Sequence, residues 1–118
     1  MQREELAAEK GCLIREITPF LPVLRSSIDV SQAEVACRIG ISRQTYCAIE
    51  QGKRPMSWNT FLSLFLLFQT SKGSRALLER ADGFMDRVYQ LLEPQKEQRF
   101  RAPSGERPEL RHLKENQV

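Results

Sequence analysis

The sequence has little of what metal sites, disulfide frameworks and catalytic centres are built from. It contains three cysteines, Cys12, Cys37 and Cys47, and a single histidine, His112. An odd number of cysteines at these spacings fits neither a disulfide framework nor a zinc site, so reduced thiols in a cytoplasmic protein are expected. No Ser/His/Asp, Cys/His or phosphate-binding pattern is present either, and we therefore expect neither an enzyme nor a cofactor or metal.

Long apolar runs are also missing. The most apolar stretch, residues 58–68, is too short to cross a bilayer, and the first ten residues, MQREELAAEK, are too charged for a signal peptide. What is present is ordinary for a globular protein, with 41% hydrophobic and 28% charged residues in 118. We expect one modest core with appendages and no membrane partner.

The net charge of +3 gives only a weak indication of a polyanionic partner. The distribution of charge is more informative. Residues 1–30 carry four Lys/Arg against five acids, whereas residues 31–70 carry four against two. The basic excess therefore begins at residue 31, where the signals for short helices also concentrate.

Capping residues and glycines divide the chain into helices. Ser31 and Glu34 have the spacing of a capping box, and Ser42 and Ser57 are further N-caps. Gly40 and Gly52 can take the left-handed conformation that ends a helix. With Thr18 as the cap of an early helix, the expected helices cover residues 3–17, 19–27, 32–39, 43–51, 58–70 and 74–92.

The last of these helices carries a heptad pattern of apolar residues, Leu77, Ala81, Phe84, Val88 and Leu91. This stripe either covers the apolar helix 58–68 within one chain or forms a dimer seam. The excess of apolar faces favours the dimer, although Gly83 inside the pattern argues against a long coiled coil. From residue 93 onward the chain is polar, with six Lys/Arg against five acids, and is interpreted as a flexible tail.

The most informative stretch, residues 31–55, reads SQAEVACRIGISRQTYCAIEQGKRP. It combines two short capped helices with a glycine turn of about four residues, which is the pattern of a helix-turn-helix. Ala36 is small enough for the second helix to cross closely, and an apolar seam fixes the crossing through Val35, Ile39, Ile41 and Ile49. The second helix is thereby held out from the body of the domain.

The outward face of that second helix carries polar and small side chains suited to the major groove, namely Ser42, Arg43, Gln44, Thr45, Cys47, Ala48 and Gln51. Gln44 can form a bidentate pair with adenine, and Arg43 can reach guanine or phosphate. Ala48 and Cys47 can pack on a thymine methyl group. Gln32, at a helix N-terminus, suits a phosphate oxygen.

The same stretch resembles the Cro/C1-type helix-turn-helix family of repressors, also called the xenobiotic-response-element (XRE) family. The matching positions are Ser31, Gln32, Glu34, Ala36, Gly40, Ser42, Gln44, Glu50, Gly52 and Lys53. The resemblance covers about residues 18–70. It implies an all-α, lambda-repressor-like DNA-binding domain of about five helices, here with an added C-terminal helix.

The resemblance also implies roles for individual residues. Gln32 would bind phosphate, Arg43 and Gln44 would read bases, and the amides and cations of Lys53 and Arg54 would hold the DNA backbone. Relatives often pair an arginine of the first helix with the glutamate that ends the recognition helix, and Arg25 and Glu50 occupy those places here. Two departures, Tyr46 for an aliphatic residue and Ala48 for a polar one, prevent the transfer of a base preference.

We therefore expect a cytoplasmic, nucleoid-associated bacterial transcription regulator, a homodimeric repressor of double-stranded DNA sites. Its parts would be an N-terminal helix (1–17), a helix-turn-helix domain (18–71), a C-terminal helix for dimerisation (72–92) and a polar tail (93–118). The alternative is an antitoxin or other protein-binding module that neutralises a partner protein through its apolar helices.

Overall fold

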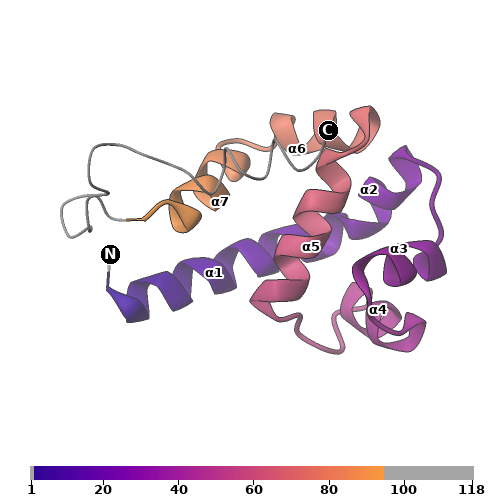
Figure 1. Ribbon diagram of the computed structural model, residues 1–118, viewed down its shortest axis with the longest axis horizontal. Helices are drawn as coiled ribbons and strands as arrows, with labels where there is room; N and C mark the ends of the chain where they lie inside the picture. The colour runs from indigo at the N-terminus through magenta and orange to yellow at the C-terminus, as the bar shows by residue number, and fades with distance from the viewer. Residues whose placement is uncertain (1, 95–118) are drawn as a thin grey trace, which may run out of the picture.

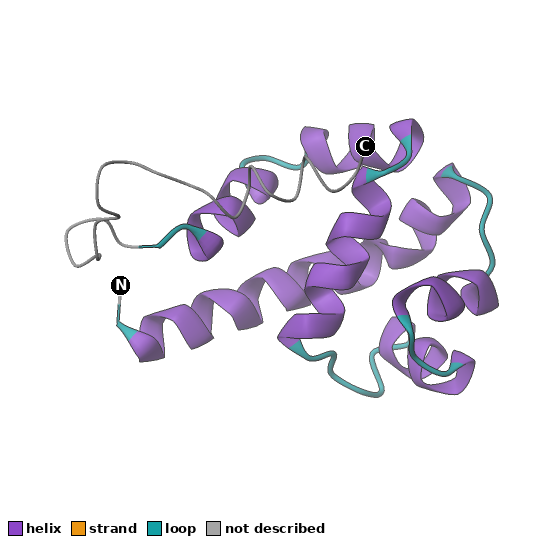
Figure 2. Cartoon of the chain, viewed as in Figure 1, coloured by secondary structure: helices purple, strands orange, loops and turns teal. Residues whose placement is uncertain are grey.

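The computed structural model describes residues 2–94, and every regular element in this range is helical (Figure 2). In chain order these are α1 (Arg3–Ile17), the 3-10 helix η1 (Thr18–Phe20), α2 (Leu21–Ser27), α3 (Gln32–Ile39), α4 (Arg43–Glu50), α5 (Trp58–Gln69), α6 (Lys72–Arg80) and α7 (Phe84–Leu92). The predicted all-α class is confirmed. Most of the predicted tail, including His112, lies outside the described residues.

Helix α5 lies at the centre of the packing and crosses α1 (Figure 1). It contacts α1, α3 and α6, which explains why its apolar residues surround most of the helix. Phe61, Leu64 and Phe68 are fully buried, and the ring of Phe61 stacks on that of Trp58. Helix α1 contributes Leu13 and Ile17 to the same core. None of the helices within residues 2–94 has the length and apolar character needed to cross a membrane.

The three predicted serine caps are present. The Oγ atoms of Ser31, Ser42 and Ser57 accept hydrogen bonds from the third amide of α3, α4 and α5 at 3.0, 3.0 and 3.1 Å. The return half of the expected capping box at Ser31 does not form, because the Glu34 carboxylate instead binds Arg38 at 2.7 Å. The cap therefore depends on the serine alone.

The prediction that Thr18 caps a helix starting at Pro19 is wrong. The Thr18 hydroxyl donates to the carbonyl of Ile14 at 2.7 Å and so closes the end of α1. Residues Thr18–Phe20 continue as one 3-10 turn before α2 begins at Leu21. Pro22 then lies in the first turn of α2, where the missing N–H has no helical partner to lose.

The prediction of a single C-terminal helix within residues 72–92 is also wrong, because this segment forms two helices, α6 and α7. Gly83 has a φ of +70°, a left-handed conformation that interrupts the helix before Phe84. The break lets Leu78 of α6 and Phe84 and Val88 of α7 enter the core together. A continuous heptad seam therefore does not exist in the described residues.

Candidate nucleic-acid interface

Helices α3 and α4 form the expected pair joined by a tight turn. Gly40 has a φ of +81°, and the amide of Ile41 donates to the carbonyl of Ala36 at 3.0 Å across it. The Ala36 side chain is itself buried at the crossing of the two helices, beside Val35. A short loop and a small side chain thus fix how α4 leaves α3.

The inward side of α4 is anchored by Tyr46 and Ile49, which are both buried. The outward side carries Arg43, Gln44 and Gln51, which are exposed. Thr45, Cys47 and Ala48 are half-buried at the edges of this face. The Ser42 hydroxyl donates to Thr45 Oγ1 at 2.8 Å while it caps the helix, so these two hydroxyls are occupied with each other.

The loop after α4 places two cations beside the exposed face. Gly52 has a φ of +76°, and the amides of Lys53 and Arg54 both donate to the carbonyl of Ala48, at 2.9 and 3.2 Å. These two amides are therefore used to end α4, contrary to the role that the resemblance gave them. The side chains of Lys53 and Arg54 remain exposed, and these are what the loop can offer to a phosphate.

Glu50, at the end of α4, receives the Arg25 guanidinium in a bidentate pair. Arg25 Nε lies 2.7 Å from Glu50 Oε2, and Nη2 lies 3.0 Å from Oε1. Arg25 Nη1 also donates to the carbonyl of Val30 at 3.1 Å. The glutamate side chain is only 6% exposed, so the pair that the resemblance implied is largely shielded from water. It joins α2, the loop before α3, and α4.

Two further side chains bind Glu50 and a third binds one of these two, contacts that the sequence did not indicate. The Tyr46 hydroxyl donates to Glu50 Oε2 at 2.7 Å, and Gln32 Nε2 donates to Glu50 Oε1 at 2.8 Å. The Cys47 thiol in turn donates to Gln32 Oε1 at 3.0 Å. The four-residue spacing of Tyr46 and Glu50 on one helix face is the signal that could have found the first contact.

The side chain of Gln32 does not point outward as its predicted role as a phosphate ligand requires. Its side chain is half-buried and both ends of its amide are bound within the protein, to Glu50 and Cys47. What the start of α3 presents outward is a shallow hollow of about 380 Å³ lined by Arg25, Ser31, Gln32, Ala33 and Arg43. A cation and a helix N-terminus therefore meet there.

The charges of the cluster stabilise one another. Burial raises the pKa of Glu50, but the hydrogen bonds from Arg25, Tyr46 and Gln32 outweigh burial and hold that pKa below its ordinary value. The hydrogen bond to Glu50 raises the pKa of Arg25. Burial and the neighbouring carboxylate raise the pKa of the Tyr46 phenol, which stays protonated and donates.

The arrangement links α4 to α2 and α3 through the Glu50 carboxylate. Among residues 2–94, no group of three or more His, Cys, Asp or Glu side chains could hold a metal ion, and no buried side-chain nitrogen or oxygen lacks a hydrogen-bond partner. Comparison of the chain with protein-family models, curated proteins and solved structures found no match.

Proposed function

We propose that this protein binds double-stranded DNA sequence-specifically and acts as a repressor of transcription. The observation that carries the proposal is the outward face of α4, where Arg43, Gln44 and Gln51 are exposed while the inward face is fixed by Tyr46 and by the Glu50 cluster. An exposed polar helix held rigidly by the helix before it is what major-groove reading requires. In this proposal the helices form a lambda-repressor-like DNA-binding domain.

Base reading falls to the first turns of α4. Gln44 presents an amide that can pair with N6 and N7 of adenine, and Arg43 can pair with O6 and N7 of guanine. Half-buried Ala48 offers a methyl contact to thymine. Thr45 and Cys47 lie half-buried at the edge of this surface, where the Thr45 hydroxyl accepts a hydrogen bond from Ser42 and the Cys47 thiol donates to Gln32.

Backbone phosphates would be held at two places flanking α4. The first is the hollow at the start of α3, where the positive end of the helix dipole favours an anion. The second is the loop after α4, through the exposed cations of Lys53 and Arg54. Together they would fix the register of α4 in the major groove of the operator. The regulator would act in the cytoplasm, associated with the nucleoid.

Selection of bound duplexes from a random DNA pool, followed by fluorescence anisotropy titration, tests the proposal. The wild-type chain is expected to enrich one motif. Gln44→Ala is expected to weaken binding to that motif by about 1 to 3 kcal/mol and to relax one base position. Gln90→Ala, which changes an exposed glutamine on α7, serves as the matched control and should bind like the wild type. Unchanged selection and affinity for Gln44→Ala would contradict the role of α4.

A further inference from the structure

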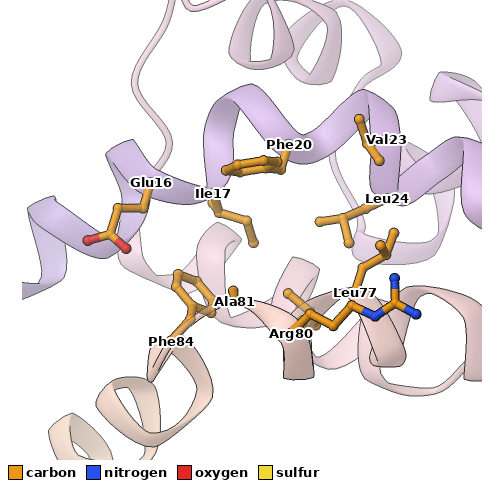
Figure 3. Close-up of a pocket in the computed structure, with 10 residues that line it drawn as sticks. Glu16, Ile17, Phe20, Val23, Leu24, Leu77, Arg80, Ala81 and Phe84 are labelled. Carbon is orange, nitrogen blue, oxygen red and sulfur yellow. The ribbon is translucent and has the colours of Figure 1, made fainter.

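An apolar groove lies on another part of the surface, between the end of α1, η1 and α2 on one wall and α6 and α7 on the other (Figure 3). Its volume is about 370 Å³. Ile17 and Leu24 form part of one wall, and Leu77, Ala81 and Phe84 form part of the other. No residue of α3 or α4 lines it, so it is separate from the candidate DNA surface.

The rim of the groove is apolar and exposed to solvent. Phe20 is 61% exposed and Val23 is 52% exposed, and both stand at the edge of the hollow. Exposed aromatic side chains beside an apolar hollow are typical of a surface that another molecule covers. Polar groups are few, with Glu16 on the first wall and Arg80 on the second.

We propose that this groove is the interface between two copies of the chain. The patch contains both a protruding side chain, Phe20, and a hollow next to it that is widened by the small side chain of Ala81. A surface with both features fits a second copy of itself, as an isologous two-fold interface requires.

The charges on the rim favour the same occupant. In a two-fold dimer whose axis passes midway between Glu16 and Arg80, each Glu16 would face the partner subunit's Arg80. The same ion pair would then form twice across the interface. Glu16 already binds Arg87 at 2.8 Å, and a carboxylate has room to accept a further donor. Arg80 makes no ion pair within residues 2–94 and is free to supply it. One acid and one base make the patch complementary to itself rather than to a partner of strong net charge.

The interface does not depend on the proposed function, although it would supply the two-fold symmetry that an inverted-repeat operator needs. Its test is therefore made without DNA, by sedimentation equilibrium of the full chain from about 1 µM to 1 mM, a range that covers weak to moderate dimers. The wild type is expected to dimerise with rising concentration. Phe20→Ser should raise the dissociation constant about tenfold or more, as loss of a central aromatic anchor does.

Leu66→Ser is the matched control, because Leu66 is 64% exposed on α5 and does not line the groove. It should dimerise like the wild type, and circular dichroism establishes that both variants are folded. A wild-type chain that stays monomeric throughout overturns the proposal, as does dissociation by Leu66→Ser with no effect of Phe20→Ser. Binding of an apolar dye or a different protein by a monomeric wild type, lost in Phe20→Ser, would assign the groove to another occupant.

Charge reversal gives a second test that does not require Phe20→Ser to fold. Arg80→Glu and Glu16→Arg each place like charges together in a homodimer and should each dissociate it. Mixed in equal amounts, the two variants restore both opposite-charge pairs and should form a heterodimer. In the wild type Arg87 also lies 3.8 Å from Glu9, so Glu16→Arg leaves Arg87 one acidic neighbour on α1. A mixture that stays monomeric overturns the proposal, whereas a dimer that binds no DNA leaves it standing and removes only the proposed function.

Discussion

The Glu50 carboxylate joins α4 to α2 and α3. One carboxylate accepts two hydrogen bonds from Arg25, one from Tyr46 and one from Gln32, so side chains from α2, α3 and α4 meet on it. Charge-assisted hydrogen bonds of this kind are about twice as strong as neutral ones. Removing the charge leaves the Arg25 guanidinium, only 19% exposed, without its counter-charge.

Stability should therefore depend on pH through Glu50. Its folded-state pKa lies below the unfolded value, so its stabilisation is fully present above an unfolded pKa of about 4.3 and is lost as the pH falls through the folded value. Glu50→Gln is expected to cost about 2 to 4 kcal/mol at pH 7. The difference from wild type should shrink below about pH 4, as measured by urea unfolding at several pH values.

Glu34→Gln provides the comparison for this experiment. Glu34 pairs with Arg38 at 2.7 Å, but both side chains are well exposed, at 45% and 67%. Exposed pairs of this spacing contribute about 0.3 to 0.5 kcal/mol, so Glu34→Gln should differ little from wild type at any pH. An equal loss in both variants, or a Glu50→Gln deficit that does not change with pH, would argue against the cluster as described.

At the scale of elements, the approach of α6 to α2 is limited by Gly73. A Cβ atom placed there would lie 2.9 Å from the backbone carbonyl oxygen of Ser27, which cannot move without shifting the end of α2. Gly11, inside α1, is the opposite case. A Cβ atom there meets only the end of the flexible Arg15 side chain, at 3.2 Å. Close packing of α6 on α2 therefore requires glycine at position 73, whereas the packing around α1 does not require it at position 11.

Gly73→Ala is expected to destabilise the fold by about 1 to 3 kcal/mol, because the new methyl group forces α6 and α2 apart. Gly11→Ala should instead stabilise by about 0.5 to 1 kcal/mol, since alanine restricts the unfolded chain and favours the helix. Thermal unfolding followed by circular dichroism measures both changes. A destabilised Gly11→Ala together with a neutral Gly73→Ala would reverse this assignment.

Comparison with the sequence shows which elements local chemistry determines. The serine caps and the turns at Gly40 and Gly52 were predictable, because each depends on a few neighbouring residues. The break at Gly83 was not predicted, since the heptad pattern continues through it. The Asp82-Gly83 pair was the available turn signal. The inward turn of Gln32 depends on Glu50, 18 residues away, which no local pattern reveals.

At the scale of the whole molecule, the two proposed surfaces share no residue. The exposed polar face belongs to α4 and its following loop, whereas the apolar groove belongs to α1, η1, α2, α6 and α7. Helix α2 contributes to both, because Arg25 lines the hollow beside α4 whereas Val23 and Leu24 line the groove. A dimer formed through the groove therefore leaves α4 of each copy open, and two copies can engage two half-sites of one operator.

The salt dependence of DNA binding tests this whole-molecule arrangement. If Lys53 and Arg54 of each subunit neutralise one phosphate apiece, a dimer makes four such contacts, and the logarithm of the association constant should fall with the logarithm of salt concentration with a slope of about −3 to −4. Lys53→Ala should reduce the magnitude of that slope by about 2 and weaken binding to all sequences alike. Lys72→Ala, an exposed lysine on α6, should leave the slope unchanged. Altered base preference in Lys53→Ala with an unchanged slope would mean that this loop reads bases and does not hold phosphate.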